Sequence, residues 1–398
     1  MPFPYGSPND GIREPAGASM NRPPDGLPGR YRGEFPILER KVYLNSNSLG
    51  ALSRRAVAYR HQFEDQWNDL GASAWYELWM RKLEDVRAAF GRTVGASPDE
   101  IALLPSVSAG LAAVAGALDF RDRNRVVLTE LDFPTLAYQF LSRERTGLEV
   151  IMVESPDGIE IPIERIEAVV DERTALLATS HVFFSSGAIQ DAAALARIAH
   201  RQGAYFLLDA YQASGQVPID VKAWDVDFLV SGSLKWLCGG PGMAFLYVRP
   251  ELEMEPTTLS WFGVEDQFGF DLRAARPHPD ARRFEMGTPA VGAAFTAAGG
   301  LEIVEEVGIE RIRERNRELT EDLVERLAEA GLRPHVAPEA TRRSAVVLAD
   351  HPDAAGAVRR LAELGIIIDF RKDRVRLSPH FYNTFEDNRL AVEALIES

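Results

Sequence analysis

The sequence predicts an α/β protein in which a large domain holds a mostly parallel, seven-stranded sheet between helices and a small α+β domain follows at the C-terminal end. Two observations predict this fold class. Short apolar runs alternate with helical patterns through the middle of the chain, which is typical of a sheet covered on both faces. Beyond about residue 299 a long charged helical pattern leads into mixed strands and helices. The 398 residues are enough to bury two cores.

The chain opens with a segment, residues 1–33, that contains seven prolines and six glycines and lacks hydrophobic periodicity. We predict an arm there, either a disordered tail or an extension that embraces a second subunit. The large domain is expected over residues 34–298, beginning with two amphipathic helices between Leu52 and about Gly95. Three tryptophans recur there at helical spacing and are expected in the core: Trp67, Trp75 and Trp79.

Seven short apolar runs are the predicted strands of the large domain. They are Ile101–Leu104, Val126–Thr129, Val150–Val153, Ala175–Thr179, Tyr205–Leu208, Phe228–Val230 and Ala244–Val248. Helical stretches such as Ala192–Arg201 separate several of them. In open sheets of this kind, ligands bind beyond the carboxyl ends of the strands.

The C-terminal domain is expected over residues 299–398. It begins with one long charged helix, about Gly299–Ala330. The elements that follow are a strand at Ser344–Leu348, a helix at Ala354–Leu364, strands at Ile366–Phe370 and Arg374–Leu377, and a final helix.

The composition of the chain argues against several classes of binding partner and cellular location. Hydrophobic residues make up 46% and charged residues 26%, as in an ordinary globular protein, and the net charge is -15. An acidic surface repels nucleic-acid phosphates and anionic lipid, so we expect neither partner. No apolar run is long enough to span a membrane, and no secretory signal opens the chain. The single cysteine, Cys238, fits a reducing compartment, and the cytoplasm is the expected location. We predict no metal site.

Lys235 is the strongest candidate for chemistry. The chain has five lysines, and four of them (Lys41, Lys82, Lys222 and Lys372) lie in charged or loop segments typical of solvated side chains. Lys235 instead follows a buried strand and precedes a glycine-rich turn, in Ser231-Gly-Ser-Leu-Lys-Trp-Leu-Cys-Gly-Gly-Pro-Gly242. Desolvation lowers the pKa of an amine, as a Schiff-base lysine requires. A lysine with its amine in solvent is the alternative.

Asp209 supports this interpretation, because it ends the apolar run Tyr205-Phe-Leu-Leu. A buried carboxylate needs a cationic partner, and a pyridinium nitrogen is one. Gln212, three residues on, could reach a hydroxyl on the same ring. A helix cap is the alternative role for Asp209.

Phosphate donors are expected where a strand gives way to a helix, at Ser106, Val107 and Ser108. A helix N-terminus offers free N–H groups and the positive end of its dipole. A simple N-cap is the alternative for either serine. Phe133 follows another strand and could stack on a pyridine ring, and Ser185-Ser186 could supply a further hydroxyl.

In this order, these motifs resemble the fold-type-I enzymes of pyridoxal 5′-phosphate (PLP) in the class V aminotransferase group, and kynureninase most of all. The similarity runs from about Tyr43 to the C-terminus. It is carried by Tyr43-Leu-Asn-Ser-Asn-Ser-Leu-Gly50, Phe133-Pro-Thr135, Leu234-Lys-Trp-Leu-Cys-Gly-Gly-Pro-Gly242, Trp261-Phe-Gly263, Gly287-Thr-Pro289, Asp369-Phe-Arg371 and Arg376-Leu-Ser-Pro-His-Phe-Tyr-Asn-Thr-Phe-Glu-Asp387.

The resemblance implies PLP as the cofactor and a homodimer with shared active sites. Arg376 would grip the substrate α-carboxylate, with Asn47 and Ser48 nearby. The cofactor site implied in full comprises Lys235, Asp209, Gln212, Ser106, Val107, Ser108, Phe133, Ser186, Ser233, Trp261 and Thr288.

Several positions depart from kynureninase. That family has a tyrosine at the position of Leu234, a His at Gln212, an Asp at Leu136 and a His at Val264, and these changes argue against kynurenine itself as the substrate. Asp209-Ala-Tyr-Gln212 is closer to the cysteine desulfurases, but the only cysteine, Cys238, is expected to be a small buried residue.

The sequence thus predicts a PLP enzyme that cleaves a bond at Cβ of a small amino acid, as a lyase or a kynureninase-like hydrolase. Transamination is the first alternative and epimerisation the second. A dehydrogenase is disfavoured because no Gly-x-Gly-x-x-Gly opens a helix after the first strand. A non-catalytic scaffold is disfavoured because it needs none of Lys235, Asp209 and Arg376.

Overall fold

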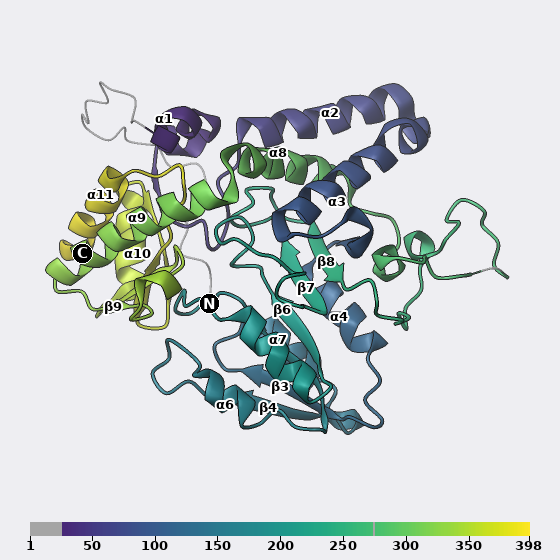
Figure 1. Ribbon diagram of the computed structural model, residues 1–398. Coiled ribbons are helices and arrows are strands. Elements are labelled where there is room, and N and C mark those ends of the chain that lie inside the picture. Colours follow the sequence, from purple (N-terminus) through teal and green to yellow (C-terminus); the bar gives the residue numbers. More distant parts are fainter. Residues whose placement is uncertain (1–25, 274) are drawn as a thin grey trace.

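The computed structural model describes residues 26–273 and 275–398, and a seven-stranded sheet lies at its centre (Figure 1). The strand order is β2-β8-β7-β6-β5-β3-β4. β8 runs antiparallel to its neighbours β2 and β7, and the other neighbouring pairs are parallel, which confirms the predicted mostly parallel sheet. The strands are β2 Ile101–Leu104, β3 Arg125–Thr129, β4 Glu149–Val153, β5 Thr174–Ser180, β6 Tyr205–Asp209, β7 Phe228–Gly232 and β8 Ala244–Val248.

Helices cover both faces of this sheet, as the continuous apolar strands require. On β6, Phe206 packs in the same cluster as α7 (Ala192–Arg201), whereas the next residue, Leu207, packs in the cluster that contains α4 (Val107–Ala117). Because successive strand residues point to opposite faces, α4 and α7 lie on opposite sides. Two shorter helices complete these connections, α5 Pro134–Leu141 and α6 Ile163–Glu167.

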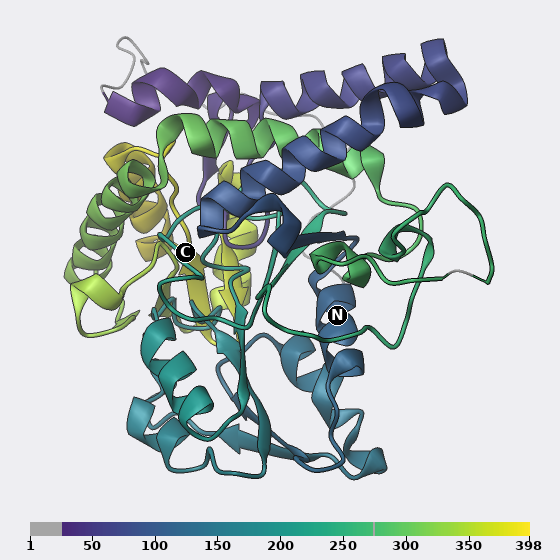
Figure 2. The same cartoon turned by 45° about the vertical axis from the view of Figure 1, so that its right-hand side comes forward.

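A further helical layer covers the large domain: α2 (Arg54–Leu70), α3 (Met80–Val94) and α8 (Val291–Val307). α8 lies against both α2 and α3 (Figure 2). Its close approach to α2 depends on Gly299, where a Cβ would lie 2.6 Å from the Ala56 Cα.

The C-terminal region contains a four-stranded antiparallel sheet in the order β12-β13-β10-β9, with three helices packed on it and on one another (Figure 1). Its elements are α9 Ile309–Glu329, β9 Pro334–His335, β10 Val347–Asp350, α10 Ala354–Glu363, β11 Ile366–Ile367, β12 Asp369–Arg371, β13 Arg374–Leu377 and α11 Phe385–Ile396. β11 pairs in parallel with β1 (Val42–Tyr43), so the start of the chain joins the C-terminal region.

The predicted single helix over Gly299–Ala330 is wrong. The chain forms α8 and α9 instead, and they meet at Gly308, whose φ is 87°. α8 is buried nearly all round, and a Cβ at Gly300 would lie 2.1 Å from the Leu237 carbonyl oxygen. By packing, α8 therefore stays with the large domain. The domain division at residue 299 remains a prediction.

The tryptophans and the arm also differ from expectation. Trp79 is buried and Trp75 half-buried, but Trp67 is 60% exposed, so it is not a core residue. Residues 1–25 of the predicted arm lie outside the described residues. Residues 26–33 include helix α1 (Gly26–Tyr31), and Arg32 pairs with Asp387 at 2.8 Å, so this part packs on its own chain. Among the described helices, none has the length and hydropathy needed to cross a membrane.

Candidate active site around Lys235

Lys235 lies in the loop after β7, at the carboxyl end of the parallel strands. The Ser233 hydroxyl closes this loop by donating to the Gly240 carbonyl oxygen at 2.7 Å. Gly50 packs against the loop: its N–H donates to the Leu234 carbonyl at 2.9 Å, and a Cβ at Gly50 would lie 2.0 Å from the Lys235 carbonyl oxygen. The lysine is therefore held in a fixed, buried place.

The surroundings of Lys235 favour its neutral amine. Burial lowers the pKa of the amine far below its usual range. Asp209 opposes this shift, while Arg376 and Arg371 add to it. A larger share of the amine is thus unprotonated at neutral pH, which is the form that attacks an aldehyde.

Asp209 is the last residue of β6 and is buried as predicted. Its Oδ1 accepts a hydrogen bond from the Tyr211 N–H at 2.9 Å. Burial raises the pKa of the carboxyl, and the charge of Lys235 opposes that rise. Within the described parts of the chain Asp209 has no ion pair closer than 4.0 Å, so this carboxylate is suited to a cationic ligand such as a pyridinium.

Two aromatic rings face the Lys235 amine. Nζ lies 5.7 Å from the centroid of Phe133, which stands just before α5 and is 44% exposed. It lies 4.5 Å from the centroid of Tyr211, which comes from the loop after β6. Sequence reasoning assigned Phe133 to the site but missed Tyr211.

The expected phosphate donors lie at the N-terminus of α4. Ser106 is the N-cap, and its hydroxyl accepts from the Ala109 N–H at 3.2 Å. Val107 is the first helical residue, and Ser106 and Ser108 are exposed. The first N–H groups of a helix have no partner within it, so this end can bind an anion.

Arg376 lies on β13 and is 1% exposed. Its Nη2 donates to the Asp369 carboxylate at 2.6 Å and to the Ser48 hydroxyl at 2.9 Å. Nη1 donates to the Phe184 carbonyl at 3.1 Å, while Nε has no partner among the described residues. Burial lowers the pKa of the guanidinium to about 10, so it remains charged at neutral pH.

The segment that carries Asn47 and Ser48 is held by the C-terminal residues. The Ser378 hydroxyl donates to Asn47 Oδ1 at 2.8 Å, and Ser46 shares a hydrogen bond of 2.8 Å with the Tyr382 hydroxyl. Asn47 Nδ2 is buried and lacks a partner in the described chain. The site therefore holds two buried donors, on Asn47 and Arg376, that a ligand could satisfy.

The Gln212 side chain bonds two other segments of the chain, and its contact with a ring hydroxyl stays a prediction. Its Oε1 accepts from the Trp236 Nε1–H at 2.9 Å, and its Nε2 donates to the Asn47 carbonyl at 3.0 Å. His380 in turn bonds the Trp236 carbonyl at 3.0 Å through Nε2. The Gln212 side chain thus joins the lysine loop to the Asn47 segment, which leaves one amide hydrogen at most for a ring hydroxyl.

Ser186 is also not where a cofactor-binding role would place it. Its hydroxyl donates to the Ile159 carbonyl at 2.7 Å and accepts from the Ala188 N–H at 3.3 Å. We therefore leave Ser186 out of the proposed site. The neighbouring Ser185 hydroxyl is buried with no partner among the described residues, and it follows the residue whose carbonyl binds Arg376.

Asp132 is a buried carboxylate that sequence reasoning missed. It accepts from the Thr129 N–H at 3.0 Å, the Thr179 hydroxyl at 3.0 Å and the Ser180 N–H at 2.6 Å. Burial raises the pKa of Asp132, and these hydrogen bonds oppose the rise. Asp132 thereby ties the end of β3 to the end of β5, directly beside Phe133. The sequence pattern that could have identified Asp132 is a carboxylate that directly follows an apolar strand.

Trp261 and Thr288 lie on the long segment between β8 and α8. Trp261 is half-buried and its indole N–H donates to the Gln267 carbonyl, while Thr288 is exposed. The structure places neither against Lys235 within one chain, and a role across a dimer stays a prediction.

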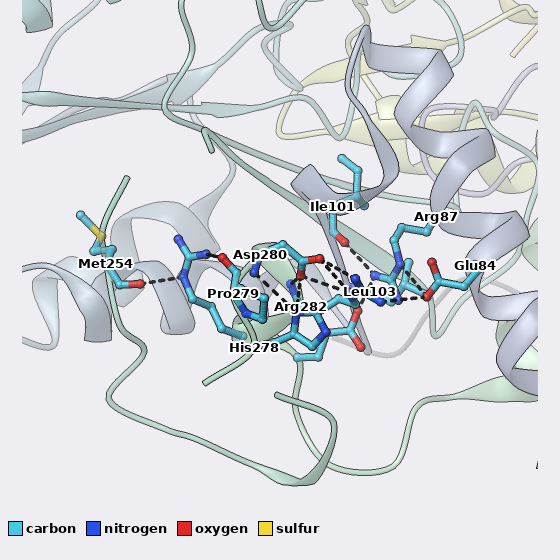
Figure 3. Close-up of polar contacts among 11 residues, drawn as sticks. Glu84, Arg87, Ile101, Leu103, Met254, His278, Pro279, Asp280 and Arg282 are labelled. Atoms are coloured by element: carbon cyan, nitrogen blue, oxygen red, sulfur yellow. Dashed lines mark hydrogen bonds and ion pairs between the residues drawn. The ribbon is translucent and has the colours of Figure 1, made fainter. Parts of the chain in front are cut away.

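Figure 3 shows the polar contacts that fasten this segment to α3 and β2. At their centre, Arg87 of α3 donates to the Ile101 carbonyl at 2.7 Å and to Glu285 at 2.5 Å. Glu285 also accepts from the Leu103 N–H at 2.9 Å.

Two known proteins are similar to this chain over nearly its whole length. A relative from Bacillus subtilis (strain 168), an uncharacterized aminotransferase named YcbU, is 36% identical over 373 residues, which are 93% of this chain and 97% of that protein. A kynureninase from Geobacillus thermodenitrificans (strain NG80-2) is 31% identical over 376 residues, covering 90% of this chain and 88% of the relative.

Solved structures share the fold. A cysteine desulfurase from Thermococcus onnurineus NA1 superposes with a TM-score of 0.84 at 22% identity, covering 94% of this chain and 99% of that one. A C-DES mutant with glycine covalently linked to its PLP cofactor has a TM-score of 0.82 at 20% identity, with 92% and 98% covered.

The family model for class V aminotransferases matches residues 42–369, which include every strand of the main sheet and the Lys235 loop. Pyridoxal phosphate is the cofactor that this match supports, and the buried Lys235 and Asp209 fit it. The dehydrogenase interpretation is thereby excluded. The chain belongs to the class V aminotransferase family of PLP-dependent enzymes.

Proposed function

We propose that this enzyme binds PLP covalently through Lys235 and cleaves a bond at Cβ of a small amino acid, as a lyase or a kynureninase-like hydrolase. One observation carries the proposal: the Lys235 amine and the Asp209 carboxylate are buried together at the carboxyl ends of the strands, each with its pKa shifted toward the neutral form. The similarity to kynureninases over nine-tenths of the chain supports chemistry beyond Cα.

Each residue of the proposed site would have its own role in binding the cofactor. Lys235 forms the covalent link, Asp209 faces the pyridine nitrogen, and the N-terminus of α4 at Ser106–Ser108 binds the phosphate. Phe133 packs on the ring, with Tyr211 near the amine. Bound PLP supplies an electron sink for the pair that is left when a bond at Cα breaks.

On the substrate side, Arg376 binds the α-carboxylate, and the Asn47 and Arg376 donors that lack partners within the described chain are available to it. With PLP and substrate bound, the Lys235 amine would remove the proton at Cα, because its lowered pKa leaves it unprotonated and so able to accept a proton at neutral pH. The same amine can return a proton after the group on Cβ has left.

Transamination is the second candidate, because the relative at 36% identity carries an aminotransferase name. It requires Lys235 to return the proton to the cofactor's carbon rather than to the substrate. Epimerisation is a third outcome of the same proton abstraction, and it needs a donor on the opposite face of Cα. A desulfurase mechanism that carries a persulfide on the enzyme's own cysteine is disfavoured, because burial raises the pKa of Cys238, the single cysteine, to about 12.

A homodimer with shared active sites forms part of the proposal. Four apolar side chains near the Trp261 segment and the end of α2 are exposed: Trp67, Tyr76, Phe270 and Leu272. A second subunit would cover them and bring Trp261 or Thr288 to its neighbour's phosphate site. Light scattering on the purified protein tests this, and a monomer at micromolar concentration would refute it.

The test of the reaction is an absorption spectrum of wild type and of Lys235→Ala, followed by incubation with a panel of amino acids. We expect a visible PLP band that wild type shows and the variant loses. Pyruvate, alanine or a freed side-chain fragment would support Cβ cleavage, pyridoxamine phosphate would support transamination, and loss of optical activity alone would support epimerisation. A wild type without a PLP band even after PLP is added would refute the proposal and favour a non-catalytic scaffold.

A further inference from the structure

Tyr211 lies beside the Lys235 amine, and the family pattern above assigns it no role. Its ring centroid lies 4.5 Å from Nζ, nearer than that of Phe133 at 5.7 Å. Its backbone N–H orients Asp209. Within the described chain, the Tyr211 hydroxyl makes no hydrogen bond. Hydrogen bonding of the hydroxyl therefore does not explain why a tyrosine stands at this position.

A glycine on a second strand leaves the space that the Tyr211 ring occupies. Gly232 is the last residue of β7, and a Cβ there would lie 2.4 Å from Tyr211 Cε2 and 3.0 Å from its hydroxyl oxygen. Any other residue at Gly232 would push the ring away. The chain thus combines a tyrosine on the loop after β6 with a glycine on β7, and together they bring an aromatic wall to Lys235.

The charged groups that face Lys235 are Asp209, Arg376 and Arg371. Tyr211 does not join them, because burial, helped by Asp209, raises the pKa of its phenol to about 12. The ring therefore acts on the amine in two ways only. It attracts the ammonium form, an effect of about one pKa unit, and it excludes water, which lowers the pKa by up to about 3–5 units when an amine is fully buried.

We propose that Tyr211 is a positioning residue whose ring holds the Lys235 amine in place and keeps water from it. Exclusion of water is the larger of the two effects, so removing the ring raises the pKa of Lys235. The proposal deepens the proposed function, since the neutral amine is the form that takes up the cofactor. The test uses the full chain freed of cofactor, so the role of Tyr211 and the proposed PLP-dependent reaction can be refuted independently of each other.

The experiment measures the protonation of Lys235 directly. Any bound PLP is released with hydroxylamine, and the protein is acetylated with short pulses of acetic anhydride across a pH series. Peptide mass spectrometry reads each of the five lysines separately, so the other four are internal standards. Four variants are compared with wild type: Tyr211→Leu, Tyr211→Phe, Gly232→Ala and, as a matched surface control, Tyr138→Leu.

We expect the Lys235 midpoint to lie well below those of the other lysines in wild type. It should rise by about one pH unit or more in Tyr211→Leu and in Gly232→Ala, which displaces the ring without changing the tyrosine. Tyr211→Phe keeps the ring and Tyr138 is exposed on α5, so both variants should match wild type.

An unchanged midpoint in both Tyr211→Leu and Gly232→Ala would overturn the proposal. So would a shift in Tyr211→Phe as large as that in Tyr211→Leu, because the hydroxyl rather than the ring would then be responsible. If Tyr211→Leu does not fold, Gly232→Ala against Tyr211→Phe decides the question. The expected shifts in a protein that shows no PLP band would refute the proposed function and leave this inference standing.

Discussion

Arg376 is buried and forms an ion pair with the half-buried Asp369, with Nη2 and Oδ2 2.6 Å apart. The Ser48 hydroxyl donates to the same carboxylate oxygen at 2.7 Å, and the second oxygen accepts from Arg371 at 2.7 Å. Burial alone would raise the pKa of Asp369, but Arg376 and these hydrogen bonds bring it below the usual value. Asp369 is therefore a fixed negative charge that sets the plane of the Arg376 guanidinium.

Replacing this carboxylate should weaken substrate binding more than it slows the reaction. In Asp369→Asn we expect KM for the amino acid identified in the panel to rise about tenfold, with a smaller change in kcat, because Arg376 loses its orienting charge. Steady-state kinetics measure the split. Asp353→Asn, which breaks the exposed pair with Arg360, is the matched control and should behave as wild type. An unchanged KM in Asp369→Asn would show that Arg376 needs no such support.

The Arg87–Glu285 pair should matter for stability far more than an exposed pair formed by another arginine of α3. Arg87 and Glu285 are both nearly inaccessible, so Arg87→Met leaves a buried carboxylate without its partner. We expect a loss of about 3–5 kcal/mol in the free energy of unfolding, measured by urea denaturation. Arg92 lies on α3 like Arg87, and Arg92→Met removes its exposed pair with Glu305 of α8, so about 1 kcal/mol or less should be lost. Equal losses in the two variants would contradict this interpretation.

His380 should make the protein less stable in acid. Burial lowers the pKa of its imidazole to about 3, and the bond to the Trp236 carbonyl opposes that shift only in part. Between about pH 6.5 and pH 3 the unfolded chain binds a proton at His380 that the folded chain does not, so the free energy of unfolding falls as the pH falls. The expected slope from this residue is about 1.4 kcal/mol per pH unit.

The measurement compares slopes rather than stabilities. In His380→Gln the slope of the unfolding free energy against pH should be smaller than in wild type by about 1.4 kcal/mol per pH unit, whatever the stability of the variant at pH 7. His61→Gln, on the exposed side of α2, serves as the control and should keep the wild-type slope. The assignment to His380 fails if wild type and His380→Gln lose stability in parallel on acidification.

The sequence was sufficient for the main sheet and for the buried positions of Lys235 and Asp209, because both depend on local patterns. Strands buried on both faces are continuous apolar runs, and a polar residue at the end of such a run, such as Asp209, lies at the ligand-binding edge. Lys235 could be found by the same reasoning, since the other lysines lie in charged or loop segments.

Other features depend on tertiary neighbours that no local pattern reveals. The helix break at Gly308 was missed because α8 is buried nearly all round and continues the apolar pattern up to the break. The hydrogen bond from the Trp236 indole to Gln212 joins two loops that are 24 residues apart, so the position of Gln212 three residues after Asp209 could not reveal it. The ring of Tyr211 can be placed only when Gly232 is known to lie beneath it.

Gly50 offers the sharpest test of how the N-terminal segment supports the lysine loop. A methyl group at Gly50 would lie 2.0 Å from the Lys235 carbonyl oxygen and 3.0 Å from the Cys238 Cα, and backbone atoms cannot yield as a flexible side chain can. In Gly50→Ala the loop and the Asn47 segment must separate, so we expect PLP to bind at least about tenfold more weakly, a loss of about 1.4 kcal/mol. Fluorescence titration with PLP measures this affinity. Gly33→Ala, where a Cβ meets nothing within 4 Å, is the matched control. Wild-type affinity in Gly50→Ala would mean that the lysine loop keeps its shape without the N-terminal segment.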